Sequence, residues 1–464
     1  MKKVISFILI LALAAGMMIG CGKSEEGAAD NTVVKETDSE EGTDAAEEAV
    51  QETPGEKKKL IWFTEQMDDS QYAKWMEYVV TPFNESHPDI EVEISATADY
   101  EQVLKVQLAA NGGPDICNMG GPTITSEYVE GDKILDLTEY VENAGLDKKI
   151  FKWALDSCKV NGKIYSVPNS YEALMLWYNV DMFEENGWKV PETYEELKTV
   201  CEDAQDKGII PIAFGTSDFK AINEQFVGVA LCAYAGRENV KKALNGEMKW
   251  TDPVFQEAIT TLNDMWQAGW INDKKSHAIS QDDGYSLFYN QSAAMAMTGT
   301  WSLGTFAEQI QDFKYGAVAF PSLKDGVPPT LCMGAGGVIA INANTKYPDE
   351  CFEFINFLFN NDELQAQAVS NGLQPLPYDM DESLYSSDMN EVDKEVLSTL
   401  ENSQSNLESA GFVMWTYWPA ETRQYMMDNI ENVYLGNLTV EDYLEKTQSI
   451  FEKEFESGKL IPVS

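Results

Sequence analysis

The feature that most constrains this fold is an alternation of short apolar segments with amphipathic ones. Apolar segments at 60–63, 90–94 and 115–119 are separated by segments at 71–86 and 100–110, whose apolar side chains recur at helical spacing. Parallel strands need long connections, so this β-α-β-α-β order predicts a parallel sheet with helices on both faces. The expected fold class is therefore α/β.

The alternation continues toward the C-terminus without an internal repeat. Thr193, followed three residues later by Glu196, has the pattern of a helix-capping box. About 400 residues with abundant aromatic side chains can bury a large core, and this length favours two or more domains. Further strands are expected at 163–168, 174–178, 209–214, 293–297, 317–320 and 336–341, and further helices at 192–206, 349–359, 421–435 and 440–455.

Polar residues follow the first and third expected strands. Glu65 and Gln66 come directly after the first strand, and Asn118 and Gly120 lie at the end of the third. In open α/β sheets, ligands bind beyond the carboxyl ends of the strands. These residues are therefore candidates for a ligand site.

Residues 1–20 are predicted to be a signal peptide. Two lysines precede an uncharged apolar run over 4–19, which is shorter than the ~20 residues of a membrane-spanning helix and typical of an export signal. Cys21 then ends a segment, 18–21, that is similar to a bacterial lipoprotein cleavage box. This similarity implies cleavage before Cys21 and acylation of its thiol. The alternative is an ordinary signal peptide with an incidental cysteine.

Residues 21–56 are predicted to be the lipidated cysteine and a disordered acidic linker. Over 22–56 there is no aromatic residue, and acidic residues outnumber lysines twelve to two. Such a segment cannot bury enough apolar surface to offset the entropy lost on ordering. Because acyl chains anchor a protein without spanning the bilayer, we expect a folded part held at the extracytoplasmic face of the cell membrane.

Charge and cysteine content set further limits. The formal net charge of −44 argues against binding to nucleic acid. Disulfides are permitted in an exported protein, but six cysteines allow fifteen pairings, and buried free thiols are the alternative. The cysteines after Cys21 are Cys117, Cys158, Cys201, Cys232, Cys332 and Cys351.

The sequence contains no catalytic or cofactor motif that we can identify. The two histidines, His87 and His277, are expected to be exposed. There is no nucleophile elbow, zinc-binding helix, phosphate loop, dinucleotide fingerprint or calcium-loop spacing. We therefore predict no catalytic residue, no metal site and no cofactor. The acidic residues are too numerous for a catalytic pair to be picked out, so a glycoside hydrolase stays open.

Several short motifs, in a fixed order, resemble the extracellular solute-binding proteins of ABC importers, in the sugar-binding group that includes maltose-binding protein. The resemblance covers nearly all of 60–455. Gln291 departs from it, because the family usually has glycine at this turn. The motifs lie at 113–116, 128–138, 161–168, 178–183, 191–197, 293–301, 336–341 and 345–350.

This resemblance implies a periplasmic-binding-protein-like fold with two lobes. Each lobe would be a mostly parallel sheet flanked by helices, with the ligand between the lobes and closure about hinge crossings. We expect crossings near Pro168, Pro321 and Pro377. Lobe 1 would comprise 57–168 plus 321–376, and lobe 2 would comprise 169–320 plus 377–464.

The resemblance also implies aromatic contacts to a sugar, which presents apolar C–H faces and a ring of hydroxyls. Trp301 is expected to stack on the ligand, the alternative being a Trp packed in the core. A second sugar-facing Trp is implied at Trp415 or Trp418, followed by Arg423. The sequence does not choose between these two Trp residues.

Polar contacts are implied as well. Tyr171 and Glu172 match a motif with a hydroxyl-binding Glu, for which the alternative is a solvated acid. Glu65 and Gln66 lie where the family also contacts sugar. Gly336 either brings a backbone N–H close to the ligand or permits a tight turn.

The implied function is a lipid-anchored receptor that binds a carbohydrate, with an oligosaccharide as the expected ligand, and delivers it to the membrane subunits of an ABC permease. It would act as a monomer and catalyse nothing. A surface glycoside hydrolase and a receptor for a non-sugar solute are the alternatives. The sequence does not name the sugar, its linkage or its length.

Overall fold

The first predicted strands lie in a five-stranded sheet of the computed structural model, which describes residues 57–67, 69–97, 99–404, 410–458 and 463. In spatial order the strands are β2 (Ile90–Thr97), β1 (Lys58–Glu65), β3 (Ile116–Met119), β12 (Val338–Ile341) and β6 (Val167–Pro168). β1 pairs in parallel with β2 and β3, which confirms the predicted parallel unit. β12 runs antiparallel to β3 and β6, so the sheet is mixed.

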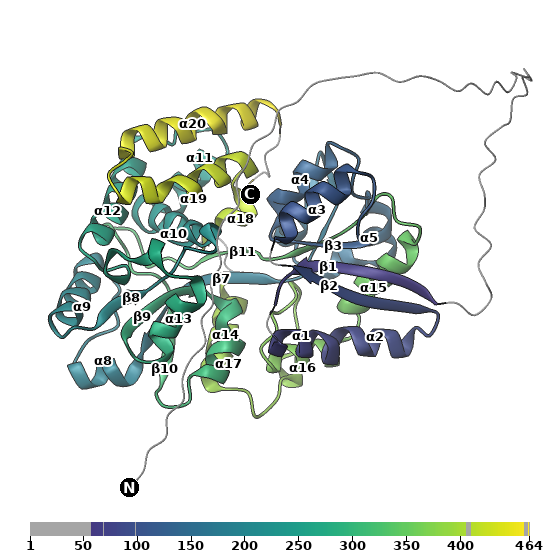
Figure 1. Ribbon diagram of the computed structural model, residues 1–464, viewed down its shortest axis with the longest axis horizontal. Helices are drawn as coiled ribbons and strands as arrows, with labels where there is room; N and C mark the ends of the chain where they lie inside the picture. Colours follow the sequence, from purple (N-terminus) through teal and green to yellow (C-terminus); the bar gives the residue numbers. More distant parts are fainter. Residues whose placement is uncertain (1–56, 68, 98, 405–409, 459–462, 464) are drawn as a thin grey trace, which may run out of the picture. The chain divides into compact units, whose positions relative to one another are not determined.

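Helices cover both faces of the parallel strands, as Figure 1 shows with α3 and α4 on one side and α1 and α2 on the other. The helix predicted over 71–86 contains a π-helical turn, Met76–Val80, at its centre. Trp62 of β1 packs edge to face against Trp75, with ring centroids 5.0 Å apart, and so fixes this helical segment to the sheet. The helices are α1 (Asp69–Trp75), α2 (Thr81–Ser86), α3 (Tyr100–Ala109) and α4 (Pro122–Val129).

Further helices belong to the same part of the chain. They are α5 (Thr138–Ala144), α6 (Leu146–Lys149), α7 (Lys152–Ser157), α15 (Pro348–Phe359) and α16 (Asp362–Ser370). Phe354 of α15 packs against both Trp62 and Phe83 in the core beside β1. His87 is half-buried and stacks on Phe83, so the prediction that it is exposed is wrong, whereas His277 is exposed as predicted.

The second sheet has six strands, of which the long strand β7 is central. In spatial order they are β13 (Gly411–Phe412), β11 (Cys332–Ala335), β7 (Tyr171–Asn179), β9 (Ala293–Gly299) and β8 (Ile210–Ala213), with β10 (Tyr315–Val318) also paired to β7. β7 is antiparallel to β9, β10 and β11, while β8 and β9 are parallel. This sheet is therefore more antiparallel than the mostly parallel sheet that the resemblance implied.

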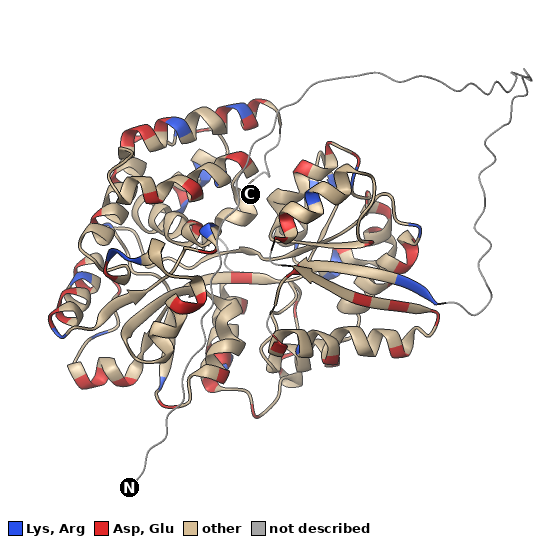
Figure 2. Ribbon diagram, viewed as in Figure 1, with Lys and Arg blue, Asp and Glu red and all other residues tan. Residues whose placement is uncertain are grey.

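Around this sheet lie α8 (Val180–Asn186), α9 (Tyr194–Asp206), α10 (Asn223–Ala235), α11 (Arg237–Leu244), α12 (Pro253–Gln267), α13 (Gln281–Tyr289), α14 (Leu303–Gln309), α17 (Glu391–Gln404), α18 (Met414–Tyr417), α19 (Ala420–Tyr434) and α20 (Val440–Glu456). The expected cap of α9 is present, because Thr193 Oγ1 accepts the Glu196 N–H at 3.3 Å. Residues of α10 are buried on nearly every side, which explains its almost uniformly apolar sequence. Figure 2 shows that acidic residues are spread over the helices around both sheets rather than gathered in one patch.

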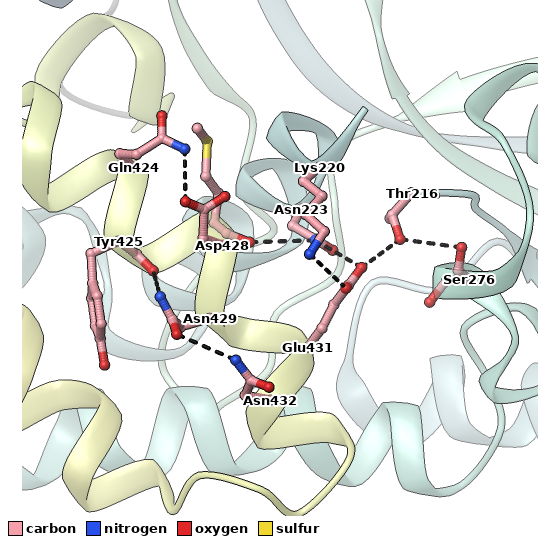
Figure 3. Close-up of polar contacts among 11 residues, drawn as sticks. Thr216, Lys220, Asn223, Ser276, Gln424, Tyr425, Asp428, Asn429, Glu431 and Asn432 are labelled. Carbon is pink, nitrogen blue, oxygen red and sulfur yellow. Dashed lines mark hydrogen bonds and ion pairs between the residues drawn. The ribbon is translucent and has the colours of Figure 1, made fainter. Parts of the chain in front are cut away.

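A polar cluster ties α19 to the rest of this sheet's helices (Figure 3). The Glu431 carboxylate accepts hydrogen bonds from Thr216 Oγ1 at 2.6 Å and from Asn223 Nδ2 at 3.1 Å. Lys220 Nζ lies 3.9 Å from the same carboxylate. These contacts join α19 to the start of α10 and to the segment after β8, and they hold the helix that carries Arg423.

The chain passes between the two sheets beside a pair of glycines. Asn169 and Ser170 connect β6 to β7, and Gly336 and Gly337 connect β11 to β12. The two connections are hydrogen-bonded, with Gly336 N–H to Ser170 O at 3.0 Å and Asn169 N–H to Gly337 O at 2.9 Å. The lobe boundaries remain a prediction. A crossing was expected near Pro321, but β11 still lies in the second sheet, and the chain passes to the first sheet after it, at Gly336–Gly337.

The strand expected over 163–168 is divided. β5 (Lys163–Ile164) pairs with β4 (Lys159–Val160) in a separate two-stranded ladder, and only β6 joins the first sheet. The six cysteines after Cys21 are buried free thiols. Within the described ranges, no helix combines the length and apolarity needed to cross a membrane. The predicted signal peptide, Cys21 and the acidic linker lie outside the described residues.

Candidate ligand-binding site

The carboxyl edge of the first sheet places three predicted residues close together in the chain's fold. Glu65 ends β1 and Gln66 follows it, both with exposed side chains. Asn118, near the end of β3, donates from Nδ2 to Thr64 Oγ1 at 3.4 Å and accepts from Asn169 Nδ2 at 2.7 Å. Asn118 therefore links the edge of this sheet to the passage toward the second one.

Two residues at the start of α3 extend this edge. Burial is the main cause that raises the pKa of Tyr100, and the charges of Glu101 and Glu65 add to it. Burial, with Glu101 second, also raises the pKa of Glu65, although solvent reaches its side chain.

Glu172, on β7 of the second sheet, is affected by the charge of Glu65 on β1. Burial raises the pKa of Glu172 to about 7, a hydrogen bond from Ser170 opposes this shift, and the charge of Glu65 adds to it. Ser170 Oγ donates to Glu172 Oε1 at 3.1 Å. Glu65, which comes from the other sheet, is therefore near enough to contribute to the raised pKa of Glu172.

Gly336 makes room for this carboxylate. A Cβ built on Gly336 would lie 2.2 Å from both Glu172 Oε1 and Ser170 Oγ. The Gly336 N–H donates to the Ser170 carbonyl oxygen and is therefore used within the protein. Gly336 therefore lets the Glu172 and Ser170 side chains approach the backbone, which neither sequence expectation described.

Trp301 and Trp415 form an arrangement that we call the aromatic corner. Trp301 lies in the 3₁₀ turn Thr300–Ser302 directly after β9, and its half-buried ring covers Gly299, where a Cβ would lie 2.0 Å from the ring. The Trp415 ring meets it edge to face, with centroids 5.7 Å apart and planes at 71°. Two aromatic surfaces at nearly a right angle suit a ligand with apolar faces.

The other two predicted aromatic residues lie in the core. Trp418 is 0% exposed and packs against Trp250, with ring centroids 5.6 Å apart. Tyr171 is 2% exposed and meets Phe151 edge to face at 5.7 Å. Trp415, at 6% exposed, is the one of the two C-terminal candidates that contacts Trp301.

Arg423 is engaged by an acid that sequence analysis did not identify. Its Nε and Nη2 donate to the two carboxylate oxygens of Glu224 on α10, at 2.5 and 2.7 Å. Burial alone would lower the pKa of Arg423, but the charge and hydrogen bonds of Glu224, with smaller effects of Glu101 and Tyr100, raise it. Arg423 thus lies near α3, which packs on the first sheet. Its charge is balanced by Glu224 of α10, which packs on the second sheet.

Three residues of this neighbourhood were missed from the sequence. Tyr100 and Glu101 follow the carboxyl end of β2, so the rule that selected Glu65 also applies to them. Glu224 had no such signal, since it is one of many acids at the start of a helix.

A separate cavity of about 260 Å³ lies between α17 and the turn Glu382–Leu384. Tyr385, Lys394, Leu397 and Glu401 line it with neighbouring residues, and it includes none of the predicted site residues. Among the described residues there is no group of three or more His, Cys, Asp or Glu with the geometry of a metal site.

The fold with two α/β sheets is shared by a known class of proteins, which comparison with known proteins names. The family model described as bacterial extracellular solute-binding protein matches residues 68–365, and the chain belongs to this family.

Relatives of known name are about a quarter identical to this chain over the aligned residues. The multiple sugar-binding protein of Streptococcus mutans is 27% identical over 286 residues, which cover 60% of this chain and 66%, just under two thirds, of that relative. The melibiose/raffinose/stachyose-binding protein MelE of Bacillus subtilis is 26% identical over 332 residues, or 68% of this chain and 74% of MelE.

Solved structures share the fold over nearly their whole length. A chitin oligosaccharide binding protein has a TM-score of 0.74 at 22% identity and covers 86% of this chain and 99% of its own. The solute-binding protein RafE in complex with raffinose has a TM-score of 0.69 at 20% identity, with 87% and 100% covered. These likenesses confirm the predicted two-domain α/β fold class.

Proposed function

We propose that this protein is the carbohydrate receptor of an ABC importer. The observation that carries the proposal is the aromatic corner, Trp301 and Trp415. Carboxylates contributed by both sheets, Glu65 and Glu172, add to it. Aromatic faces suit the C–H surfaces of a sugar, and carboxylate and amide groups suit its hydroxyls. The sugar-binding names of several relatives support the same substrate class.

The proposed contacts follow the geometry of the site. Trp301 and Trp415 stack on the sugar, while Glu65, Asn118 and Glu172 bind hydroxyls. Gln66 is exposed beside Glu65 and is available for a peripheral contact. Tyr171, Gly336, Trp418 and Arg423 support the site from behind, since each is buried or engaged with another residue.

The receptor would deliver its ligand to the permease subunits without transforming it and without a cofactor, acting as a monomer. The sequence at Cys21 supports a lipid anchor at the extracytoplasmic face of the membrane. Cys21→Ser should release the protein from the membrane fraction, since it removes the proposed acylation site. Retention of the variant on membranes washed at high salt would contradict the anchor and leave the binding proposal untouched.

A surface glycoside hydrolase is the second candidate, favoured by one observation. The pKa values of Glu65 and Glu172 are both raised, mainly by burial, and a raised pKa is what the acid in such an enzyme requires. Incubation with labelled oligosaccharides separates the two functions, because a receptor returns the glycan intact and a hydrolase shortens it.

A thermal-shift screen against a glycan panel tests the main proposal. A ligand at 100 times its dissociation constant stabilises the folded protein by ~2.7 kcal/mol. We expect at least one oligosaccharide to raise the melting temperature of the wild-type protein and to lose this effect with Trp301→Ala. A panel that also contains polyamines and peptides covers the third candidate, a receptor for a non-sugar solute. Stabilisation by one of those alone would contradict the carbohydrate proposal.

A further inference from the structure

The main-chain carbonyl of Trp415 accepts a hydrogen bond from a residue of α4, a helix that packs on the first sheet. Thr123, in the first turn of α4, donates from Oγ1 to Trp415 O at 3.1 Å, and both residues are buried. α4 follows β3 of the first sheet, whereas Trp415 lies in α18, which follows β13 of the second. The position of one wall of the aromatic corner therefore depends on a contact with the other sheet's helices.

Gly121, just before α4, allows this contact to form. A Cβ on Gly121 would lie 2.4 Å from Trp415 O and 3.1 Å from its carbonyl carbon. The backbone of Gly121 is extended, with φ 160° and ψ 165°, a conformation open to any residue. Glycine is needed here because the Trp415 peptide approaches so closely.

The second sheet holds the neighbouring residue. Thr416 Oγ1 donates to Ala335 O at 2.7 Å, at the end of β11 and directly before Gly336. A Cβ on Gly334 would lie 2.3 Å from Thr416 Oγ1, so this side is closely packed as well. α18 is a single turn, and one turn has little helical stability of its own. Contacts from both sheets, rather than the turn itself, must therefore place the Trp415 ring.

We propose that Gly121 and Thr123 are positioning residues for Trp415, so that α4 of the first sheet sets the geometry of the aromatic corner and with it the affinity for carbohydrate. This inference rests on the proposed function. Trp415 Nε1 is buried and has no hydrogen-bond partner among the described residues. A small displacement of α18 would move the Trp415 ring and, with it, this buried donor.

The test compares substitutions on one helix turn of α4. Thr123→Val removes the donor at nearly constant volume, and Thr123→Ser restores a hydroxyl. Thr125→Val is the matched control, since Thr125 Oγ1 contacts Ser166 and Met119 and touches no site residue. Gly121→Ala adds the Cβ that the Trp415 carbonyl would meet.

Calorimetric affinity for the best oligosaccharide of the panel is the first measurement. A neutral hydrogen bond contributes ~1 kcal/mol, so Thr123→Val should weaken binding about fivefold. Gly121→Ala should weaken it more, while Thr123→Ser and Thr125→Val should stay within about twofold of wild type. A purely structural role would instead lower the melting temperature of Thr123→Val and Thr125→Val alike and leave affinity unchanged.

Circular dichroism of the ligand-free protein is the second measurement, because two indoles 5.7 Å apart at 71° are expected to couple. The contribution of the pair is identified as the difference that Trp301→Phe produces. Loss of this contribution in Gly121→Ala and Thr123→Val, but not in Thr125→Val, supports the positioning role.

The outcomes distinguish failure of the positioning role from failure of the proposed function. Wild-type binding with equal affinity in all four variants overturns the positioning role and leaves the proposed function intact. If the wild-type protein binds no oligosaccharide, the proposed function fails, and the circular dichroism decides the positioning role by itself. An unchanged signal in both Gly121→Ala and Thr123→Val then overturns it.

Discussion

Arg423 and Glu224 form a bidentate, largely buried ion pair that joins α19 to α10, although 199 positions separate them in the chain. An arginine fork matched to both oxygens of a carboxylate has little freedom to turn elsewhere. The charge that the sequence suggested for ligand binding is thus already compensated within the protein. The charge of Arg423 still opposes the raised pKa of Tyr100.

Glu224→Gln should destabilise the fold by about 3 kcal/mol, because removal of one partner leaves a buried charge uncompensated. Urea unfolding of the ligand-free protein measures this loss. Glu238→Gln is the control, since the Glu238 side chain, which pairs with Arg237, is 72% exposed, and pairs with an exposed partner contribute well under ~1 kcal/mol. Equal stability of the two variants would show that the buried pair contributes no more than the surface one.

Trp301→Ala and Trp418→Ala should have opposite effects. Loss of the half-buried Trp301 should cost ~2 kcal/mol or more of binding, roughly 30-fold in affinity, with a nearly unchanged melting temperature of the ligand-free protein. Loss of the fully buried Trp418 should cost ~3–5 kcal/mol of folding stability. Calorimetric titration and thermal melts of both variants make the comparison. A large drop in the melt of Trp301→Ala with full affinity would place Trp301 in the core.

Glu172 should make the folded state less stable as pH rises. Its pKa is raised from 4.5 to about 7 in the folded protein, so the folded state binds more protons than the unfolded state between these values. Stability therefore falls from pH 4.5 toward pH 7, and the loss is complete above pH 7. Asp393 and Glu401, with pKa values raised to about 7 and about 8, contribute in the same direction.

The Glu172→Gln variant isolates this contribution, because glutamine resembles the protonated acid. Urea unfolding at pH 5 and at pH 7.5 should show a smaller loss of stability in Glu172→Gln than in wild type. The same loss in both proteins would mean that Glu172 titrates normally.

Gln291→Gly should stabilise the protein. Gln291 has φ 62° in the turn between α13 and β9, and its side chain is exposed. The left-handed conformation costs a non-glycine residue ~1–2 kcal/mol, and the extra freedom of glycine in the unfolded chain offsets part of the gain, so we expect a net increase of about 0.5 kcal/mol. Gln291→Ala, measured alongside by urea unfolding, should give no increase.

Ligand binding should bring the two sheets and their helices closer together. The chain passes between them at Asn169–Ser170 and Gly336–Gly337, short connections of the kind that serve as hinges. Small-angle scattering should give a smaller radius of gyration with a saturating ligand than without it. An unchanged radius at saturation would argue against closure about these connections.

Most elements of the fold could be predicted from the sequence. The three parallel strands, the cap at Thr193 and the two C-terminal helices depend on side-chain periodicity and on capping residues, which are local properties. The division of 163–168 into β5 and β6 was not predicted, because the apolar pattern is the same whether a strand continues in one sheet or leaves it. β11 was not predicted either. Its four residues do not determine which strand it pairs with, because that depends on the sheet into which it packs.

For the candidate site, too, the sequence predicted local features but not the contacts of single residues. The sequence by itself determined the family motifs, the strand ends that carry Glu65 and Asn118, and the aromatic segment 412–418. Only the tertiary structure decided that Trp415 meets Trp301 while Trp418 packs on Trp250, and that Glu224, one of 77 acidic residues, holds Arg423. Local sequence patterns show which residue types a segment contains and which secondary structure it favours. The partner of each side chain depends on how segments hundreds of residues apart pack together, and that packing is a property of the whole chain.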